Sequence, residues 1–335
     1  MDQAETIPAP AALFQMVSGL IQSRMLWAIA HLRVADTFDE SATIDEIAAA
    51  TGTHAPMLAR VLDAACSVGV FARGSDDRYR HNDLSRALRS DHPESVRAVV
   101  DTIFGGAHFE AWGSLVDGLR AGKTPFDLRF GMHSFDYYGQ HPELAEDFSR
   151  AMSASTRVME GALLAAYDFG DFELAVDVGG SRGTLIRAVL ARHPNARGIL
   201  FDRPEVIDAV NAELEGTRIT GVGGSFFESV PAGGDLYLLK FILHDWSDAD
   251  CDRILATVRE AVRRGGRLCI ADAVLPDRPD GPDPRYMMDL NMLALTGGRE
   301  RNAREFHALL GRNGFEIRQI IPTASNLSLI EAFAI

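Results

Sequence analysis

The stretch Val176-Asp177-Val178-Gly179-Gly180-Ser181-Arg182-Gly183 decides the fold of the larger part of this chain. It follows a predicted strand, Leu174–Val178, and opens a predicted helix. Glycines at such a junction let the backbone turn sharply and approach a ligand closely. Asp202 ends the next predicted strand, Gly198–Asp202, where an acid accepts hydrogen bonds from the ribose hydroxyls of an adenosine. Together these features predict a nucleotide site.

The acid before the glycines favours one class of nucleotide. A dinucleotide fingerprint has the spacing GxGxxG and places a pyrophosphate at a helix N-terminus, whereas this loop reads DxGGxxG and begins at Asp177. A carboxylate there repels phosphate but suits an ammonium or sulfonium group. We therefore expect S-adenosylmethionine, which carries both cations and no phosphate. NAD, or a glycine turn without a ligand, remains an alternative.

From about residue 170, strand-like apolar runs alternate with amphipathic helices, which is typical of a parallel sheet covered by helices on both faces. The last two strands have no helix between them and must be antiparallel. The fold class is therefore α/β. The remaining predicted strands are Leu236–Leu243, Leu268–Val274, Phe315–Pro322 and Leu327–Ile335, and the predicted helices lie at about 183–192, 247–263 and 303–312.

Candidate catalytic groups follow two of these strands. His244 comes after the run Leu236–Leu243, at the carboxyl edge where open α/β sheets bind ligands, and a histidine there can act as a general base. Asp272 ends the next strand on the same edge, where a carboxylate would fix the imidazole tautomer. The alternatives are a packed histidine and a turn-forming aspartate. Glu300 by itself would be an exposed acid in a charged loop.

Residues 1–100 read as helical with one hairpin. A long apolar stripe from Leu13 to Leu32 has helical spacing and must be buried in its own core or in a partner subunit. A capping box, Thr43 to Glu46, starts a helix that ends at Gly52, and a second helix follows at about 54–68. The hairpin over 70–80 completes a winged-helix pattern. DNA binding is the alternative use of this pattern, but the segment is acidic and offers few base-reading side chains.

Length and composition restrict the class of protein. The chain has 335 residues, a length that is typical of two domains. Its net charge of −14 argues against nucleic acid or an anionic membrane as partner. Three cysteines far apart form no CxxC pair, which argues against a disulfide framework and a zinc knuckle. No second His lies at ligand spacing from His244, so we expect no metal. Without an apolar run of about 20 residues or a signal-peptide pattern, we expect a cytoplasmic protein.

The motifs, in their order and spacing, resemble the plant-type and actinomycete small-molecule O-methyltransferases. They are Asp177-Val178-Gly179-Gly180, Lys240, His244-Asp245-Trp246-Ser247-Asp248 and Gly297-Gly298-Arg299-Glu300-Arg301. The resemblance covers nearly the whole chain. It implies a Rossmann-like sheet of seven mostly parallel strands with the last strand antiparallel, and a winged-helix region that forms a homodimer. The expected domains are residues 1–100 for dimerisation, 101–168 as a helical linker with the acceptor pocket, and 169–335 for S-adenosylmethionine binding and catalysis.

The resemblance also implies roles for single residues. His244 matches the catalytic base, with Asp272 and Glu300 as the acids beside it; the family often has Glu where this chain has Asp272. Ser225 replaces an acid that commonly meets the adenine. The expected cofactor contacts are Gly179, Gly180, Asp202, Arg203, Ser225, Phe226, Lys240, Met152 and Thr156, and the expected acceptor contacts are Phe148, Met152, Asp245, Met292 and Trp112.

The resulting hypothesis is an O-methyltransferase that acts on a hydroxyl of an aromatic secondary metabolite and releases S-adenosylhomocysteine. A phenol between the domains would give its proton to His244 as the oxygen attacks the sulfonium methyl. The alternatives are a protein of the same fold that binds the cofactor for other chemistry, a winged-helix transcription regulator and a nicotinamide oxidoreductase. The acceptor and the position methylated are not encoded in these motifs.

Overall fold

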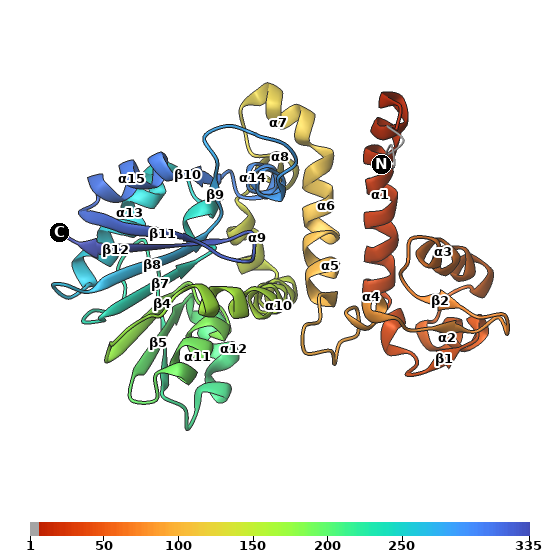
Figure 1. The fold of residues 1–335 in the computed structure, drawn as a ribbon, viewed down its shortest axis with the longest axis horizontal. Coiled ribbons are helices and arrows are strands. Elements are labelled where there is room, and N and C mark those ends of the chain that lie inside the picture. Colours follow the sequence, from red (N-terminus) through yellow and green to blue (C-terminus); the bar gives the residue numbers. More distant parts are fainter. Residues whose placement is uncertain (1–6) are drawn as a thin grey trace, which may run out of the picture. The chain divides into compact units, whose positions relative to one another are not determined.

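The computed structural model describes residues 7–335. The chain forms two compact units, which divide between Phe109 and Glu110 (Figure 1). The division of the chain at residues 100 and 168, expected from the sequence, stays a prediction.

The C-terminal unit is built on a seven-stranded sheet with the order β11-β12-β8-β7-β4-β5-β6 (Figure 1). Five neighbouring strands are parallel, and β12 runs antiparallel to both β8 and β11, so the predicted antiparallel last strand is confirmed. The strands are β4 Leu174–Val178, β5 Arg197–Asp202, β6 Ile219–Gly223, β7 Leu236–Lys240, β8 Arg267–Asp272, β11 Phe315–Pro322 and β12 Ser328–Ala334.

Successive side chains of each strand serve the two faces of this sheet. In β7, Leu236 and Leu238 pack into one hydrophobic cluster, whereas Tyr237 and Leu239 pack into the other. Both clusters are covered by helices, so the central strands consist mainly of apolar residues. One face carries α13 Asp248–Ala261 and α15 Ala303–Arg312, and the other carries α10 Pro142–Ala166, α11 Thr184–Arg192 and α12 Pro204–Leu214.

Two strand predictions need correction, and one strand is not predicted at all. The run Leu236–Leu243 is a strand only to Lys240, because Phe241 takes a left-handed φ of 56° and breaks the pleat. The run Leu268–Val274 divides into β8 and the short strand β9, Val274–Leu275. Strand β6 was not recognised, because Ile219–Gly223 is short and contains two glycines.

Residues 101–168 are mainly helical, as the sequence predicts, and one further helix, α14, and the short strands β9 and β10 complete this unit. Helix α14 packs against α8. The helices are α6 Gly106–Gly113, which crosses the boundary between the units, α7 Leu115–Ala121, α8 Pro125–Phe130, α9 Ser134–Gln140 and α14 Pro284–Leu295. Strand β9 pairs in parallel with β10, Arg301–Asn302.

The N-terminal unit confirms the helix–helix–hairpin pattern. The Thr43–Glu46 capping box starts α2, Ile44–Thr51, and Gly52 ends it with a left-handed φ of 65°. The hairpin β2–β3 is joined by β1 in a small sheet of order β1-β3-β2. The elements are α1 Ala9–His31, β1 Ser41–Ala42, α3 Ala55–Ser67, β2 Ala72–Arg73, β3 Tyr79–Arg80, α4 Asp83–Arg86 and α5 Arg97–Ile103, with a 3₁₀ turn at Val34–Asp36.

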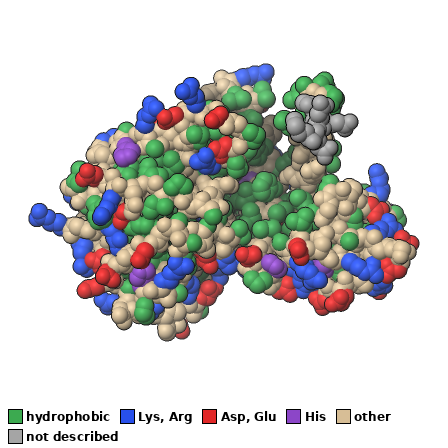
Figure 2. Space-filling view, in the orientation of Figure 1, with side chains coloured by type: hydrophobic (Ala, Val, Ile, Leu, Met, Phe, Trp, Pro, Cys, Tyr) green, Lys and Arg blue, Asp and Glu red, His purple; other side chains and the backbone are tan. Residues whose placement is uncertain are grey.

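Helix α1 buries only its C-terminal part within this unit, at Ile29 and Ala30. Its first half carries large apolar side chains that are 58% or more exposed, and Figure 2 shows hydrophobic side chains gathered on this helix. They are Leu13, Phe14, Met16, Val17, Leu20 and Ile21. No helix in the described part of the chain is both long and apolar enough to cross a membrane. An apolar surface of this kind is typical of a protein interface.

Candidate functional site

The glycine loop lies where the strand order reverses. After β4 the chain proceeds to β5 and β6 on one side, and then to β7 and β8 on the other. Ligands of open α/β sheets bind at the carboxyl ends of the strands beside this point. Gly179 has a φ of 70°, and a Cβ there would lie 2.4 Å from Ile242 Cδ1; a Cβ on Gly180 would lie 2.6 Å from Asp177 Cγ. The positive φ favours glycine at 179, and a side chain at 180 would displace Asp177 or Leu200.

Asp202, at the end of β5, is tied to this loop. Its Oδ2 accepts a hydrogen bond from the Ser181 amide at 2.8 Å, and its Oδ1 accepts one from the Arg203 amide at 2.8 Å. Burial raises the pKa of this carboxyl above its ordinary value, although both amides favour the charged form. Each carboxylate oxygen can accept a second hydrogen bond, so the acid keeps the capacity to bind two hydroxyls.

Asp177 is the last residue but one of β4, Lys240 ends the neighbouring strand β7, and the two side chains interact electrostatically. Asp177 is 2% exposed, and its Oδ2 has no hydrogen-bond partner among the described residues. Burial raises the pKa of Asp177 to about 7, against the effect of Lys240. Burial lowers the pKa of Lys240 to about 8, although Asp177, Asp272 and Asp245 oppose this. The site therefore holds a buried carboxyl that gains a partner if a cation binds.

His244 lies in a 3₁₀ turn, Leu243–Asp245, and not at the end of a strand as expected. The side chain is buried, and its Nδ1 lies 2.7 Å from Oε1 of the buried Glu300. A carboxylate there accepts a hydrogen bond from Nδ1–H, so the lone pair of the neutral ring lies on Nε2, the atom that can act as a base. Burial would lower the pKa of His244, but Glu300, Asp245 and Asp272 outweigh it and raise the pKa to about 9.

Asp272 acts on His244 electrostatically. Its Oδ1 accepts a hydrogen bond from the Phe241 amide at 3.0 Å, and its expected direct contact with the imidazole stays a prediction. Burial raises the pKa of Asp272 to about 7, with His244 acting in the opposite direction and Glu300 in the same one. Within the described residues, Asp272 Oδ2 and Glu300 Oε2 are both buried without a partner. Such unsatisfied groups are costly, and they gather at functional sites.

Pairing of two short strands carries Glu300 to this centre. Arg301 of β10 pairs with Val274 of β9, two residues after Asp272. The Glu300 amide also donates to Asp289 Oδ1 of α14 at 2.8 Å. The acid that looked exposed in the sequence is thus 3% exposed. Its position depends on contacts between segments far apart in the chain.

Aromatic side chains lie beside the His244 turn. The Trp246 ring stacks on His133 at a centroid distance of 5.2 Å and on Phe135 at 5.5 Å. Phe135 also meets Phe148 edge-on at 6.2 Å. His244 itself stacks on Phe241 at 5.0 Å, with the ring planes 8° apart. Flat apolar ligands bind to surroundings of this kind.

The other predicted contacts occupy varied positions. The Arg203 guanidinium donates to the Phe135 carbonyl and pairs with Glu205. Only the backbone amide of Arg203 hydrogen-bonds to Asp202. The Thr156 hydroxyl donates to the Met152 carbonyl one turn earlier in α10. The Ser225 hydroxyl accepts from the Phe227 amide at 3.3 Å, in a turn after β6.

Three further predicted residues stay predictions as ligand contacts. Phe226 lies beside Gly179, 3.8 Å from where a Cβ of that glycine would stand. Met292 is buried on α14, one turn after Asp289, and Trp112 lies on α6.

The donor set fits S-adenosylmethionine. The unpartnered Asp177 oxygen suits a cationic group, Asp202 suits ribose hydroxyls, and the glycines leave no room for a Cβ where the chain turns. Among residues 7–335, no group of three or more His, Cys, Asp or Glu side chains is arranged to hold a metal ion.

Two family models match the chain. An O-methyltransferase domain matches residues 112–316, and an O-methyltransferase dimerisation domain matches residues 14–91. Among similar curated proteins, a phenazine O-methyltransferase of Lysobacter antibioticus is 38% identical over 99% of this chain and 98% of its own length. An O-demethylpuromycin-O-methyltransferase of Streptomyces alboniger is 36% identical over 99% and 91%. A phenazine-1-carboxylate N-methyltransferase of Pseudomonas aeruginosa is 31% identical over 97% and 98%.

Solved structures agree with these matches. The structure of LaPhzM has a TM-score of 0.94 at 38% identity and covers 98% of this chain and 100% of that one. The methyltransferase NcsB1, solved with S-adenosylmethionine and 2-hydroxy-5-methyl naphthoic acid, has a TM-score of 0.78 at 30% identity, over 94% of this chain and 96% of that one.

Proposed function

Because this chain belongs to the O-methyltransferase family and is an S-adenosylmethionine-dependent methyltransferase of the secondary-metabolite type, we propose that it methylates a hydroxyl of an aromatic acceptor with His244 as general base. The observation that carries the proposal is the buried His244–Glu300 pair, 2.7 Å apart, at the ligand-binding edge of the sheet. A methyltransferase family is not one of nicotinamide oxidoreductases, so NAD is no longer an alternative cofactor.

The histidine–glutamate pair supports a hydroxyl acceptor in particular. A phenol is a poor nucleophile until it loses its proton, whereas an aromatic amine attacks through a lone pair that it already has. Glu300 accepts a hydrogen bond from His244 Nδ1, so Nε2 is the ring atom left to take a proton from the acceptor. S-Adenosylmethionine supplies an electrophilic methyl group when it is bound. General-base catalysis of this kind contributes roughly 10²- to 10⁴-fold to the rate.

The acids around His244 stabilise the charged ring that forms when the base takes the proton. Glu300 does so through its hydrogen bond, and Asp245 and Asp272 do so electrostatically, since each raises the pKa of His244. With a pKa of about 9, the ring holds its proton at neutral pH in the free protein. A cation bound nearby lowers that pKa, because two like charges repel each other. We therefore expect the rate to rise with pH.

The aromatic side chains around His244 support a flat, aromatic acceptor. Trp246, Phe135 and Phe148 offer ring faces and edges close to the base. Relatives named for phenazine and 3-amino-4-hydroxybenzoate substrates act on aromatic compounds.

The dimerisation domain at residues 14–91 supports a homodimer. It includes most of the exposed apolar side chains of α1, which a partner subunit would bury.

The direct test is His244→Gln, assayed with labelled S-adenosylmethionine against paired aromatic acceptors that carry a hydroxyl or an amine at the same position. We expect O-methylation to fall by roughly 10²- to 10⁴-fold, while titration calorimetry shows unchanged cofactor affinity. The second candidate function, N-methylation, is favoured by the named N-methyltransferase relative. Efficient amine methylation that survives in His244→Gln would establish it and overturn the hydroxyl assignment.

A further inference from the structure

We propose that Arg301 is a positioning residue for His244: its buried guanidinium holds the backbone of the turn that carries the base. The expected effect on the reaction rate rests on the proposed function, in which His244 is the base. The support that Arg301 gives to the turn does not depend on that function. Arg301 belongs to the sequence motif Gly297–Arg301, in which only Glu300 received a role above.

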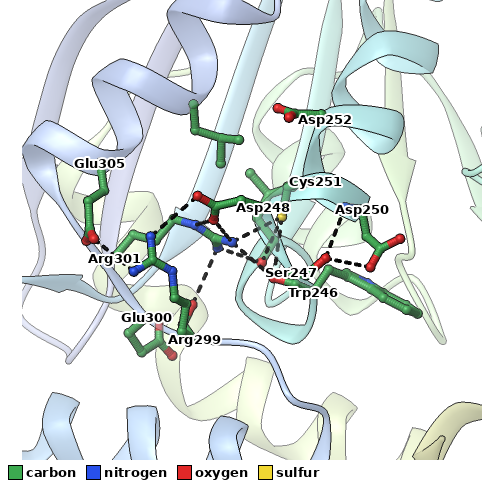
Figure 3. Close-up of polar contacts among 12 residues, drawn as sticks. Trp246, Ser247, Asp248, Asp250, Cys251, Asp252, Arg299, Glu300, Arg301 and Glu305 are labelled. Carbon is green, nitrogen blue, oxygen red and sulfur yellow. Dashed lines mark hydrogen bonds and ion pairs between the residues drawn. The ribbon is translucent and has the colours of Figure 1, made fainter. Parts of the chain in front are cut away.

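Arg301 is 1% exposed and is the largest fully buried side chain among residues 7–335. A buried cation is costly unless its hydrogen bonds are satisfied and its charge is balanced. Its Nη1 donates to the Leu243 carbonyl at 2.8 Å, and its Nη2 donates to the Trp246 carbonyl at 3.0 Å. Both Nε and Nη2 donate to Asp248 Oδ1, at 3.1 and 2.8 Å (Figure 3). The guanidinium therefore joins three points of one short segment.

The two carbonyls stand immediately before and after His244-Asp245. The turn has two backbone hydrogen bonds, Asp245 N to Ile242 O at 3.1 Å and Trp246 N to Leu243 O at 3.4 Å. The Leu243 and Trp246 carbonyls also accept from the Cys251 thiol, at 3.2 and 3.7 Å, so Arg301 supplies their charged donors. The planar, five-donor geometry of an arginine suits it to span such a turn. Arg301 thus fixes the positions of the peptide groups on either side of the base.

The backbone three residues before Arg301, at Gly298, also lies against this turn. A Cβ on Gly298 would stand 2.0 Å from the His244 carbonyl oxygen and 2.7 Å from the Trp246 nitrogen. The same segment therefore meets His244 twice. Glu300 holds its ring through Nδ1, and Gly298 and Arg301 lie against its backbone. Two adjacent residues set both the orientation of the imidazole and its place in the site.

The test compares Arg301→Met and Arg301→Lys with a matched control, Arg299→Met. Arg299 is also an arginine near Asp248, at 3.5 Å, but its side chain is 45% exposed and also pairs with Glu305 (Figure 3). The readouts are kcat, both KM values, cofactor affinity by calorimetry, thermal stability, and the pKa of His244 from histidine-labelled NMR, assigned with His244→Gln.

We expect Arg301→Met to lower kcat by roughly 100-fold, the scale of a misplacement of about 1 Å, with little change in cofactor affinity. The pKa of His244 should fall from about 9, because a displaced ring loses its close contact with Glu300. Arg301→Lys keeps the charge but cannot reach both carbonyls and Asp248 together, so it should recover only part of kcat. Arg299→Met should match the wild type in kcat and in the pKa of His244.

The proposal is overturned if folded Arg301→Met or Arg301→Lys loses thermal stability alone and keeps both kcat and the pKa of His244. If the methionine variant does not fold, the lysine variant decides by the same readouts. Failure of the proposed function looks different. In that case His244→Gln remains active, while the Arg301 variants still change the pKa of His244.

Discussion

Glu300→Gln separates the charge of the acid beside His244 from its shape. The substitution keeps the side-chain volume in a site where Glu300 is 3% exposed, and it removes the negative charge 2.7 Å from His244 Nδ1. The amide can still accept from Nδ1 through its oxygen. It can also turn and donate to Nδ1, which would place the ring proton on Nε2 and abolish the base.

The size of the effect follows from the hydrogen bond. A hydrogen bond to a charged group contributes about 1.5–3 kcal/mol, and one pKa unit corresponds to about 1.4 kcal/mol. The pKa of His244 should therefore fall by about one to two units from its value of about 9. Loss of the orienting charge and of the correct tautomer should lower the plateau rate by roughly 10²- to 10⁴-fold.

The assay is kcat/KM as a function of pH from about 6 to 10.5, which reports the pKa of the free enzyme. The inflection on the acid side should lie near pH 9 in the wild type, since His244 must lose its proton before it can act, and it should move to lower pH in the variant. A matched control is Asp101→Asn, which neutralises the acid of another histidine pair, His31–Asp101, at 2.9 Å but partly exposed in the N-terminal unit.

An inflection that stays in place in Glu300→Gln, with the plateau reduced by less than about tenfold, would refute the reasoning. In that outcome the carboxylate would have only a packing role. A shift of the same size in Asp101→Asn would show that the profile reports overall charge and not the pair.

Four further outcomes are expected. Asp202→Asn should weaken S-adenosylmethionine binding by roughly 10- to 100-fold, the value of a charged hydrogen-bond acceptor; unchanged calorimetric affinity would contradict this. Cofactor binding near pH 7 should release protons, because the bound cation lowers the pKa of Asp177 from about 7. The apparent binding enthalpy should then depend on the ionisation enthalpy of the buffer. Equal binding enthalpies in phosphate and Tris would argue against proton release. Gly298→Ala should destabilise the protein by about 1–3 kcal/mol, because overpacking strains the interior, and an unchanged melting temperature would show that the chain relaxes at no cost. Leu20→Glu, on the exposed face of α1, should dissociate the proposed homodimer in sedimentation experiments without loss of secondary structure, and an intact dimer would place the interface elsewhere.

Local sequence was enough for features that depend on neighbours in the chain. The Thr43–Glu46 capping box and the glycine of helix α2 were correct because both ends of that helix are satisfied by adjacent residues. Helix α15 lies at residues 303–312 as predicted, with a capping box at Asn302 and an amphipathic pattern. The antiparallel tail followed because two strands joined by a short loop cannot be parallel.

Boundaries near the site were predicted less well, because the backbone there is strained. The run Leu236–Leu243 looks like one strand, but the left-handed Phe241 ends it early. A non-glycine residue with positive φ costs free energy that the surrounding contacts must supply, and Phe241 receives such support from Asp272 through its amide. No local pattern encodes that support.

The sequence by itself determined the type of fold and was enough to propose the nucleotide loop with Asp202 and the place of His244 near the carboxyl edge of the sheet, since each depends on periodicity, turn chemistry or chain order. Only the tertiary structure decided which acid holds the base. Glu300 and Arg301 approach His244 because β10 pairs with β9 and because Gly298 lets the two segments touch. The physical reason is that an isolated charge in a loop prefers water. It becomes a buried partner only where distant segments bring a proton donor and hydrogen-bond acceptors to it.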